Sequence, residues 1–141
     1  MTMHSVLAQK TVGWLLQIAP SAQLTADSRR IKPGDVFIAY AGDAGDGRHY
    51  IAQAIEAGAK AVLHEAAGEF AWNPQWEVPH QAIPDLKGAA GFIANLWYGR
   101  PDQEMFSVAV TGTNGKTSCT QWLGQALSRG GMPTTVIGTL G

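Results

Sequence analysis

Residues 107–118, SVAVTGTNGKTS, combine an apolar run, a glycine-punctuated loop, and a lysine followed by a threonine. Gly112 and Gly115 allow backbone dihedrals closed to other residues and let the backbone come close to a ligand. The loop leads into a predicted helix, whose first N–H groups and dipole favour an anion. Lys116 adds a full charge suited to β- and γ-phosphates, and Thr117 adds a hydroxyl suited to Mg²⁺. The stretch therefore predicts a loop that binds a nucleotide triphosphate.

The loop is a variant of the strict phosphate-loop pattern G-x-x-x-x-G-K-[ST], because Val110 stands where that pattern has its first glycine. The alternative interpretation is a glycine-rich turn between a strand and a helix, with a solvated lysine. The apolar run, the G-K-T triplet and the following helical pattern agree with one another, and together they favour phosphate binding.

The elements that must position this loop are a buried strand over residues 106–112 and a helix over residues 116–129. A last strand is expected over residues 134–141. Two strands and one helix do not close a hydrophobic core. We therefore expect residues 105–141 to be the start of a truncated ATP-binding domain.

Residues 1–84 predict a complete small α/β domain. Pro33 and Gly34 suit the central positions of a type II turn, and the nearly unbroken apolar run after them is typical of a strand covered on both faces. The strand–helix–strand order that follows predicts one βαβ unit. The expected helices cover residues 4–18 and 50–59, and the expected strands cover residues 35–42, 60–66 and part of 77–83. Residues 85–104 are expected to form a helix, residues 85–98, and a linker.

Composition excludes several classes of protein. The chain has 141 residues, of which 45% are hydrophobic and 15% charged, so it has material for a core. A net charge of −1 gives no basic field for nucleic acid. No apolar run approaches the roughly 20 residues of a membrane span, and the single Cys119 indicates a reducing compartment. We expect a cytoplasmic protein that is a monomer and does not bind a membrane.

The loop VTGTNGKTS closely resembles the ATP loop of the Mur ligases, the ATP-dependent amide-bond ligases of peptidoglycan assembly. The N-terminal part resembles the uridine-nucleotide-binding domain of that family. There a D-S-R turn, a P-G-D-x-F-x-A strand and a D-G-x-x-[FY]-I-x-x-A-x-x-x-G-A helix follow one another, as they do here from residue 27 to residue 59. The resemblance covers about residues 25–65 and 85–141.

The resemblance implies two sets of site residues. Contacts to the uridine diphosphate are implied for Ala26, Ser28, Asp43, Ala44 and Gly45. Contacts to ATP are implied for Gly112, Thr113, Asn114, Gly115, Lys116, Thr117 and Ser118. Lys116 and Thr117 are the implied catalytic residues, and Thr117 is the implied Mg²⁺ ligand. From the residues alone, Ser28 can donate to a phosphate or to a uracil oxygen, or serve as a turn hydroxyl beside Asp27.

The resemblance also implies a reaction. A carboxylate of UDP-MurNAc-L-Ala-D-Glu attacks the γ-phosphate of ATP, and the amine of an amino acid then displaces phosphate from the acyl phosphate. Thr113-Asn114 before Gly115 favours the family members that add the third residue, meso-diaminopimelate. Because the family's downstream machinery lies outside 141 residues, we expect this chain alone to be inactive. The alternatives are a non-catalytic uridine-nucleotide-binding fragment and another phosphate-loop protein, such as a kinase or a GTPase.

Histidines and tryptophans outside these motifs are expected to be structural. His4, His49, His64 and His80 show no metal-ligand spacing. Four tryptophans, Trp72, Trp76, Trp97 and Trp122, are expected to pack in cores rather than to stack on bases.

Overall fold

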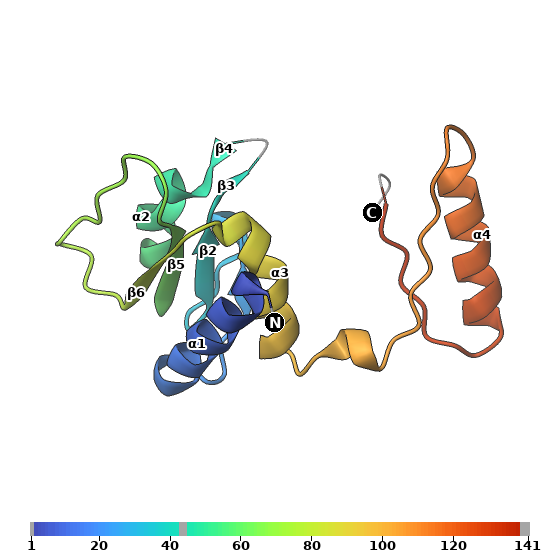
Figure 1. Cartoon of the computed structure of the whole chain (residues 1–141), viewed down its shortest axis with the longest axis horizontal. Helices are drawn as coiled ribbons and strands as arrows, with labels where there is room; N and C mark the ends of the chain where they lie inside the picture. Colours follow the sequence, from blue (N-terminus) through green and yellow to red (C-terminus); the bar gives the residue numbers. More distant parts are fainter. Residues whose placement is uncertain (1, 43–44, 139–141) are drawn as a thin grey trace. The chain divides into compact units, whose positions relative to one another are not determined.

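The computed structural model describes residues 2–42 and 45–138, which divide into two compact units, Met1–Glu104 and Met105–Gly141. The first unit is built on a parallel sheet with strand order β1-β2-β5-β6 (Figure 1). These strands are β1 (Leu24–Thr25), β2 (Val36–Ala39), β5 (Ala61–Glu65) and β6 (His80–Ile83). A short antiparallel ribbon joins β3 (Ala41–Gly42) to β4 (Gly45–Asp46). The predicted α/β class is confirmed.

Helices α1 (Met3–Ile18) and α3 (Leu86–Trp97) pack on one face of this sheet, and α2 (Ile51–Glu56) packs on the other (Figure 1). Every residue of β2 and β5 is buried. Along β2, Val36 and Ile38 face the α1–α3 layer, whereas Phe37 and Ala39 face the α2 layer. The unbroken apolar run of β2 therefore reflects a strand covered on both faces, as predicted.

Short helical turns complete the first unit: η1 (Ser28–Arg30), η2 (Gly47–Tyr50) and η3 (Pro101–Gln103). The turn at residues 32–35 has the predicted geometry, because Asp35 N–H donates to the Lys32 carbonyl at 3.0 Å and Gly34 has a φ of 97°. The predicted βαβ unit is also confirmed, since β2 and β5 are parallel and α2 connects them.

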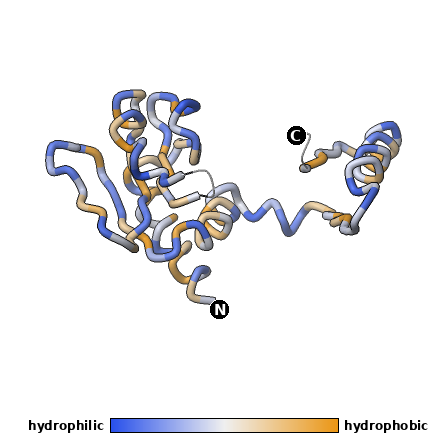
Figure 2. Tube along the Cα trace, turned by 90° about the horizontal axis from the view of Figure 1, so that it is seen from above, coloured by the Kyte–Doolittle hydropathy of each residue, from blue (hydrophilic) through white to orange (hydrophobic). Residues whose placement is uncertain are grey.

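Helix α3 belongs to the first unit, although the sequence placed it between the two domains. Leu86, Ala89 and Ile93 are fully buried in the core shared with α1 and the sheet. The unit ends after the hydrophilic segment at residues 99–104, which contains η3 and which Figure 2 shows mainly in blue. The change from apolar helix to polar connection marks the boundary.

The second unit contains α4 (Lys116–Arg129), as predicted, but not the predicted strands. Within the described part of residues 105–141, no strand forms, because a strand requires hydrogen bonds to a neighbouring strand. The apolar residues expected to be buried are exposed instead, with Phe106 at 91% and Ile137 at 90%. The prediction that Trp122 packs in a core is also wrong, since it is 70% exposed.

Candidate functional site

A hollow of about 490 Å³ lies in the first unit, beside the D-S-R turn and the helix α2. Three of the residues implied to contact a uridine nucleotide, Ala26, Ser28 and Gly45, line it. The other two, Asp43 and Ala44, lie outside the described residues. The fold thus brings together segments that lie far apart in the sequence. The remaining lining residues are Asp27, Arg29, Ile38, Tyr40, Gly42, Gly47, Tyr50 and Gln53.

The turn at one wall of the hollow is organised by Asp27. Its carboxylate accepts from the backbone N–H of Arg29 at 3.0 Å and from both Nε and Nη2 of the Arg29 guanidinium at 2.9 Å. These bonds lower the pKa of Asp27 to about 2. Asp27 is the N-cap residue of η1, so Ser28 occupies its first position and is held there, only 9% exposed.

A second wall of the hollow depends on a close backbone approach at Gly47. Its N–H donates to the Tyr40 carbonyl at 2.9 Å. A Cβ at this position would lie 2.8 Å from that carbonyl oxygen and 3.2 Å from Ala39 Cα, both backbone atoms. Only glycine fits without displacing the chain, so this residue keeps η2 against the end of β2.

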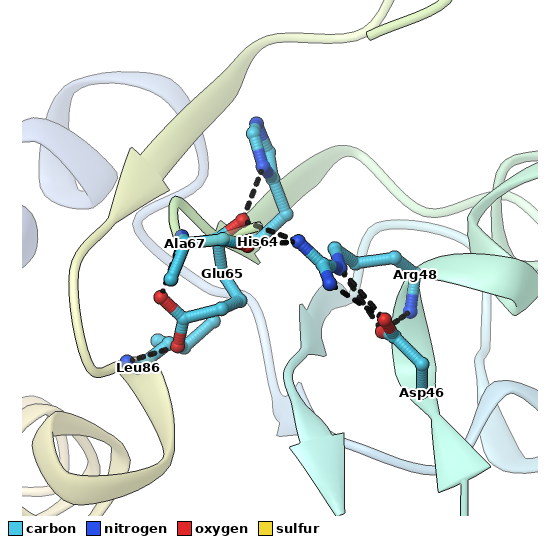
Figure 3. Close-up of polar contacts among 6 residues, drawn as sticks. All are labelled: Asp46, Arg48, His64, Glu65, Ala67 and Leu86. Carbon is cyan, nitrogen blue, oxygen red and sulfur yellow. Dashed lines mark hydrogen bonds and ion pairs between the residues drawn. The ribbon is translucent and has the colours of Figure 1, made fainter. Parts of the chain in front are cut away.

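Arg48 fastens the same wall to the sheet (Figure 3). Its guanidinium pairs with Asp46 at 2.7 Å and donates to the carbonyls of Glu65, at 3.3 Å, and Ala67, at 2.6 Å. The pairing raises the pKa of Arg48 and lowers that of Asp46. Because these donors are already used within the protein, Arg48 is a structural cation rather than a ligand contact.

Glu65 continues this network to α3 (Figure 3). Its buried carboxylate accepts from the backbone N–H groups of Ala67 at 3.0 Å, Asp85 at 3.2 Å and Leu86 at 2.8 Å. The carboxylate therefore satisfies N–H groups at the start of α3 that the helix itself leaves unpaired.

Sequence reasoning did not single out Tyr40, Gly47, Tyr50 or Gln53 as site residues, although all four line the hollow. Gly47 and Tyr50 belong to the D-G-x-x-[FY]-I motif, which was the available signal. Gln53 occupies an unspecified position of the same motif, between Ile51 and Ala54, so the motif gave no indication that α2 turns it toward Ser28.

In the second unit, the glycine-rich loop at residues 112–115 has the backbone form that the sequence predicts. Gly112 and Gly115 have φ values of 147° and 78°, in the region that glycine favours. Gly115 is the N-cap residue of α4, and the first helical bond runs from Cys119 N–H to its carbonyl at 2.9 Å. The preceding N–H groups have no partner within the helix. The Lys116 ammonium donates to the Gly112 carbonyl and so lies over the loop. These features fit a polyphosphate.

The part of the chain that the structure describes has neither a metal-holding cluster nor a membrane-spanning helix. Residues 2–42 and 45–138 contain no group of three or more His, Cys, Asp or Glu residues arranged to hold a metal ion. His64 and His80 nevertheless form a pair, with Nε2 and Nδ1 separated by 3.1 Å. Within the same described ranges, no helix combines the length and apolar character needed to cross a membrane.

Comparison with known proteins identifies the family. The model of the family described as "Mur ligase family, catalytic domain" matches residues 21–98, which include the D-S-R turn, the four-stranded sheet and α3. The chain belongs to the Mur ligase family. A relative from Janthinobacterium sp. (strain Marseille), UDP-N-acetylmuramoyl-L-alanyl-D-glutamate--2,6-diaminopimelate ligase, is 64% identical over 91% of the chain and 25% of its own length. The ligase of the same name from Nitrosomonas europaea is 48% identical over 84% of the chain and 22% of its own length. This Mur ligase chain thus spans about a quarter of these curated relatives.

Solved structures agree with the family's fold. The structure of a UDP-N-acetylmuramoyl-L-alanyl-D-glutamate--2,6-diaminopimelate ligase has a TM-score of 0.56 and 26% identity, and the match covers 90% of this chain and 28% of that one. The MurF ligase from Thermotoga maritima in complex with ADP has a TM-score of 0.54 and 25% identity, covering 77% of this chain and 24% of that one.

Proposed function

We propose that this chain carries the uridine-nucleotide site and the phosphate loop of an ATP-dependent ligase of peptidoglycan precursor synthesis. The ligase adds the third amino acid, meso-diaminopimelate, to UDP-MurNAc-L-Ala-D-Glu. The observation that carries the proposal is the convergence of Ala26, Ser28 and Gly45 on one hollow. The 64% identity with a ligase of that name supports the substrate.

The first unit binds the uridine nucleotide in this proposal. Ser28 and the turn around it hold the nucleotide, with Asp43, Ala44 and Gly45 completing the contact. Arg29 lies at the same hollow, and Asp27 fixes the direction of its guanidinium through two hydrogen bonds. A rigid scaffold of this kind positions a substrate with little loss of side-chain freedom on binding.

The second unit binds ATP in this proposal, through residues 112–118. The unpaired N–H groups at the start of α4 and the loop amides donate hydrogen bonds to phosphate oxygens. Lys116 releases the Gly112 carbonyl and neutralises the charge of the β- and γ-phosphates. Thr117 would hold Mg²⁺ through its hydroxyl, and the ion would add to the neutralisation of the phosphates. The substrate carboxylate then attacks the γ-phosphorus, ADP leaves, and an acyl phosphate forms. The incoming amine attacks the acyl carbon, which forms the amide bond and releases phosphate.

The test is calorimetric titration of the chain with UDP-MurNAc-L-Ala-D-Glu and, separately, with ATP and Mg²⁺. We expect the wild-type chain to bind both. Lys116→Ala removes the charge at the phosphates and is expected to weaken ATP binding at least tenfold, while leaving the uridine nucleotide unaffected. Lys10→Ala, which removes an exposed lysine of α1, is the matched control outside the loop.

The outcomes separate the competing functions. Loss of ATP binding in Lys116→Ala supports the ligase assignment. Uridine-nucleotide binding without any ATP binding supports a non-catalytic binding fragment. ATP binding without uridine-nucleotide binding supports another phosphate-loop protein. We expect no amide-bond formation by the chain alone, as measured by phosphate release in the presence of both substrates and meso-diaminopimelate.

A further inference from the structure

Ser28 and Gln53 form a hydrogen bond whose direction limits what the hollow can recognise. The Ser28 hydroxyl donates to Gln53 Oε1 at 3.1 Å. A serine hydroxyl has one hydrogen and two acceptor lone pairs. With its hydrogen directed to Gln53, Ser28 has only acceptor capacity left for a ligand. This differs from the sequence-based expectation that Ser28 donates to a phosphate or a uracil oxygen.

We propose that Gln53 is a specificity-determining residue of the hollow, which makes Ser28 Oγ an acceptor and presents its own amide N–H as a donor beside it. This inference rests on the proposed uridine-nucleotide site. The resulting acceptor–donor pair matches an edge that offers N–H next to C=O. Uracil has such an edge at N3–H and the neighbouring C4 carbonyl.

The positions of the two residues support this pairing. Ser28 and Gln53 come from η1 and α2, 25 residues apart, and both line the hollow. Ser28 is held in place by the Asp27 cap and is 9% exposed. Because the Ser28 hydrogen is already donated to Gln53, a ligand that offers a donor to Ser28 Oγ is favoured over one that places an acceptor there.

The remaining lining residues suit a flat heterocycle. Tyr40 and Tyr50 face the same hollow and offer aromatic surface, on which a base can stack. A phosphate oxygen at physiological pH carries no hydrogen to give to Ser28 Oγ. The diphosphate is better matched by Arg29, whose charge lies at the same hollow. The proposal therefore assigns the base to Ser28 and Gln53 and the diphosphate to Arg29.

Cytosine tests the order of donor and acceptor in the Ser28–Gln53 pair, because its own donor and acceptor are exchanged relative to those of uracil. Its N3 is an acceptor and its exocyclic N4 carries two hydrogens, so an acceptor–donor pair that fits uracil meets like groups instead. N3-methyluracil keeps both carbonyls and loses only the N–H. Comparison of these bases on one diphosphate isolates the Ser28–Gln53 pair, since the phosphate contacts stay constant.

The experiment measures the Kd of the full chain for UDP, CDP and 3-methyl-UDP by calorimetry. The wild-type chain is expected to bind UDP at least tenfold more tightly than the other two, since one mismatched hydrogen-bond pair costs about tenfold. In Gln53→Met and in Ser28→Ala, the preference of UDP over CDP is expected to fall toward one. Gln17→Met makes the same change at an exposed glutamine of α1 and is expected to keep the wild-type preference.

A double variant, Ser28→Ala with Gln53→Met, tests whether the two residues act as a unit in binding UDP. Its loss of UDP affinity is expected to be smaller than the product of the two single losses, and circular dichroism melts check that each variant is folded. If a variant does not fold, the three-ligand series on the wild-type chain still decides the question.

Two results would overturn the inference while leaving the uridine-nucleotide site in place. One is a wild-type chain that binds UDP, CDP and 3-methyl-UDP equally. The other is equal weakening of UDP and CDP in both single variants, which means that Ser28 contacts the diphosphate. A wild-type chain that binds none of the three diphosphates would overturn the nucleotide site itself.

Discussion

The two units place similar sequence patterns in opposite environments. In the first unit, Leu63 and its neighbours in β5 are buried between two layers. In the second, Phe106 and Ile137 lie in equally apolar runs but are about nine-tenths exposed. Local pattern therefore fixes a helix or a loop, whereas a strand is completed only by its hydrogen-bonded neighbours.

Helix starts show the same contrast. The first turn of α3 is closed by protein carboxylates, because Asp85 caps it and Glu65 accepts from Leu86 N–H at 2.8 Å. The first turn of α4 begins at Gly115, which has no side chain to cap it. A helix start satisfied from within stabilises the fold, and one left open is available to an anion. The difference separates a structural role from a proposed binding role.

The largest expected effect contrasts the two environments directly. Leu63→Ala leaves a cavity in a fully buried position and is expected to lower the free energy of unfolding by about 2–5 kcal/mol. Phe106→Ala changes an exposed side chain, and its effect is expected to stay within about 0.5 kcal/mol. Denaturant unfolding followed by circular dichroism measures both. Equal losses in the two variants would contradict the contrast.

The second effect concerns the buried carboxylate. Glu65→Ala removes the acceptor for three backbone N–H groups, including that of buried Leu86, and is expected to cost about 2–3 kcal/mol of unfolding free energy. Glu77→Ala, at an exposed position of the loop before β6, is the control. Hydrogen exchange of the Leu86 amide should accelerate in the first variant only. Unchanged exchange in Glu65→Ala would refute the capping role.

The sequence was sufficient for elements specified by local chemistry. The predicted helices over residues 4–18 and 116–129 and the turn at residues 32–35 appear with nearly the predicted bounds. Each depends on periodicity, a terminator or a turn residue within a few positions. The strands predicted at residues 106–112 and 134–141 failed in the described part of the chain because their partners are not local.

The hollow was only partly predictable. Ala26, Ser28 and Gly45 came from the resemblance to a family, since no local rule brings residue 26 to residue 45. Gln53 was missed because its importance depends on the packing of α2 against η1. For the same reason His64 and His80, 16 residues apart on two strands, gave no signal of the contact between their rings.

A smaller effect is expected from a matched pair of glycines. Gly47→Ala brings a Cβ within 2.8 Å of the Tyr40 carbonyl oxygen, a backbone atom that cannot rotate away, and should cost about 1–3 kcal/mol. Gly91→Ala in α3 places its Cβ where nothing lies within 4 Å, and it is expected to gain about 1 kcal/mol from helix propensity. Thermal melts and UDP titration are the measurements. We expect only Gly47→Ala to lose affinity for UDP.

The smallest effect is a pH dependence that should belong to the first unit alone. Burial lowers the pKa of both His64 and His80, and His80 and Arg48 also lower the pKa of His64. The folded state therefore binds fewer protons than the unfolded state just below the ordinary histidine pKa of about 6.5. Stability is expected to be constant above that pH and to fall as the pH drops below it, until the folded-state pKa values are passed.

The carboxylates act in a separate window, which makes the histidine contribution measurable. Asp27 and Asp46 have lowered pKa values, so their contribution is present above about pH 4 and declines only below it. Unfolding free energies between about pH 5 and pH 8 therefore report the histidines. His80→Gln should reduce the slope in that range, and His49→Gln, at an exposed site, should not. A slope of the opposite sign, or one that His80→Gln leaves unchanged, would show that desolvation of the His64–His80 pair does not set the slope.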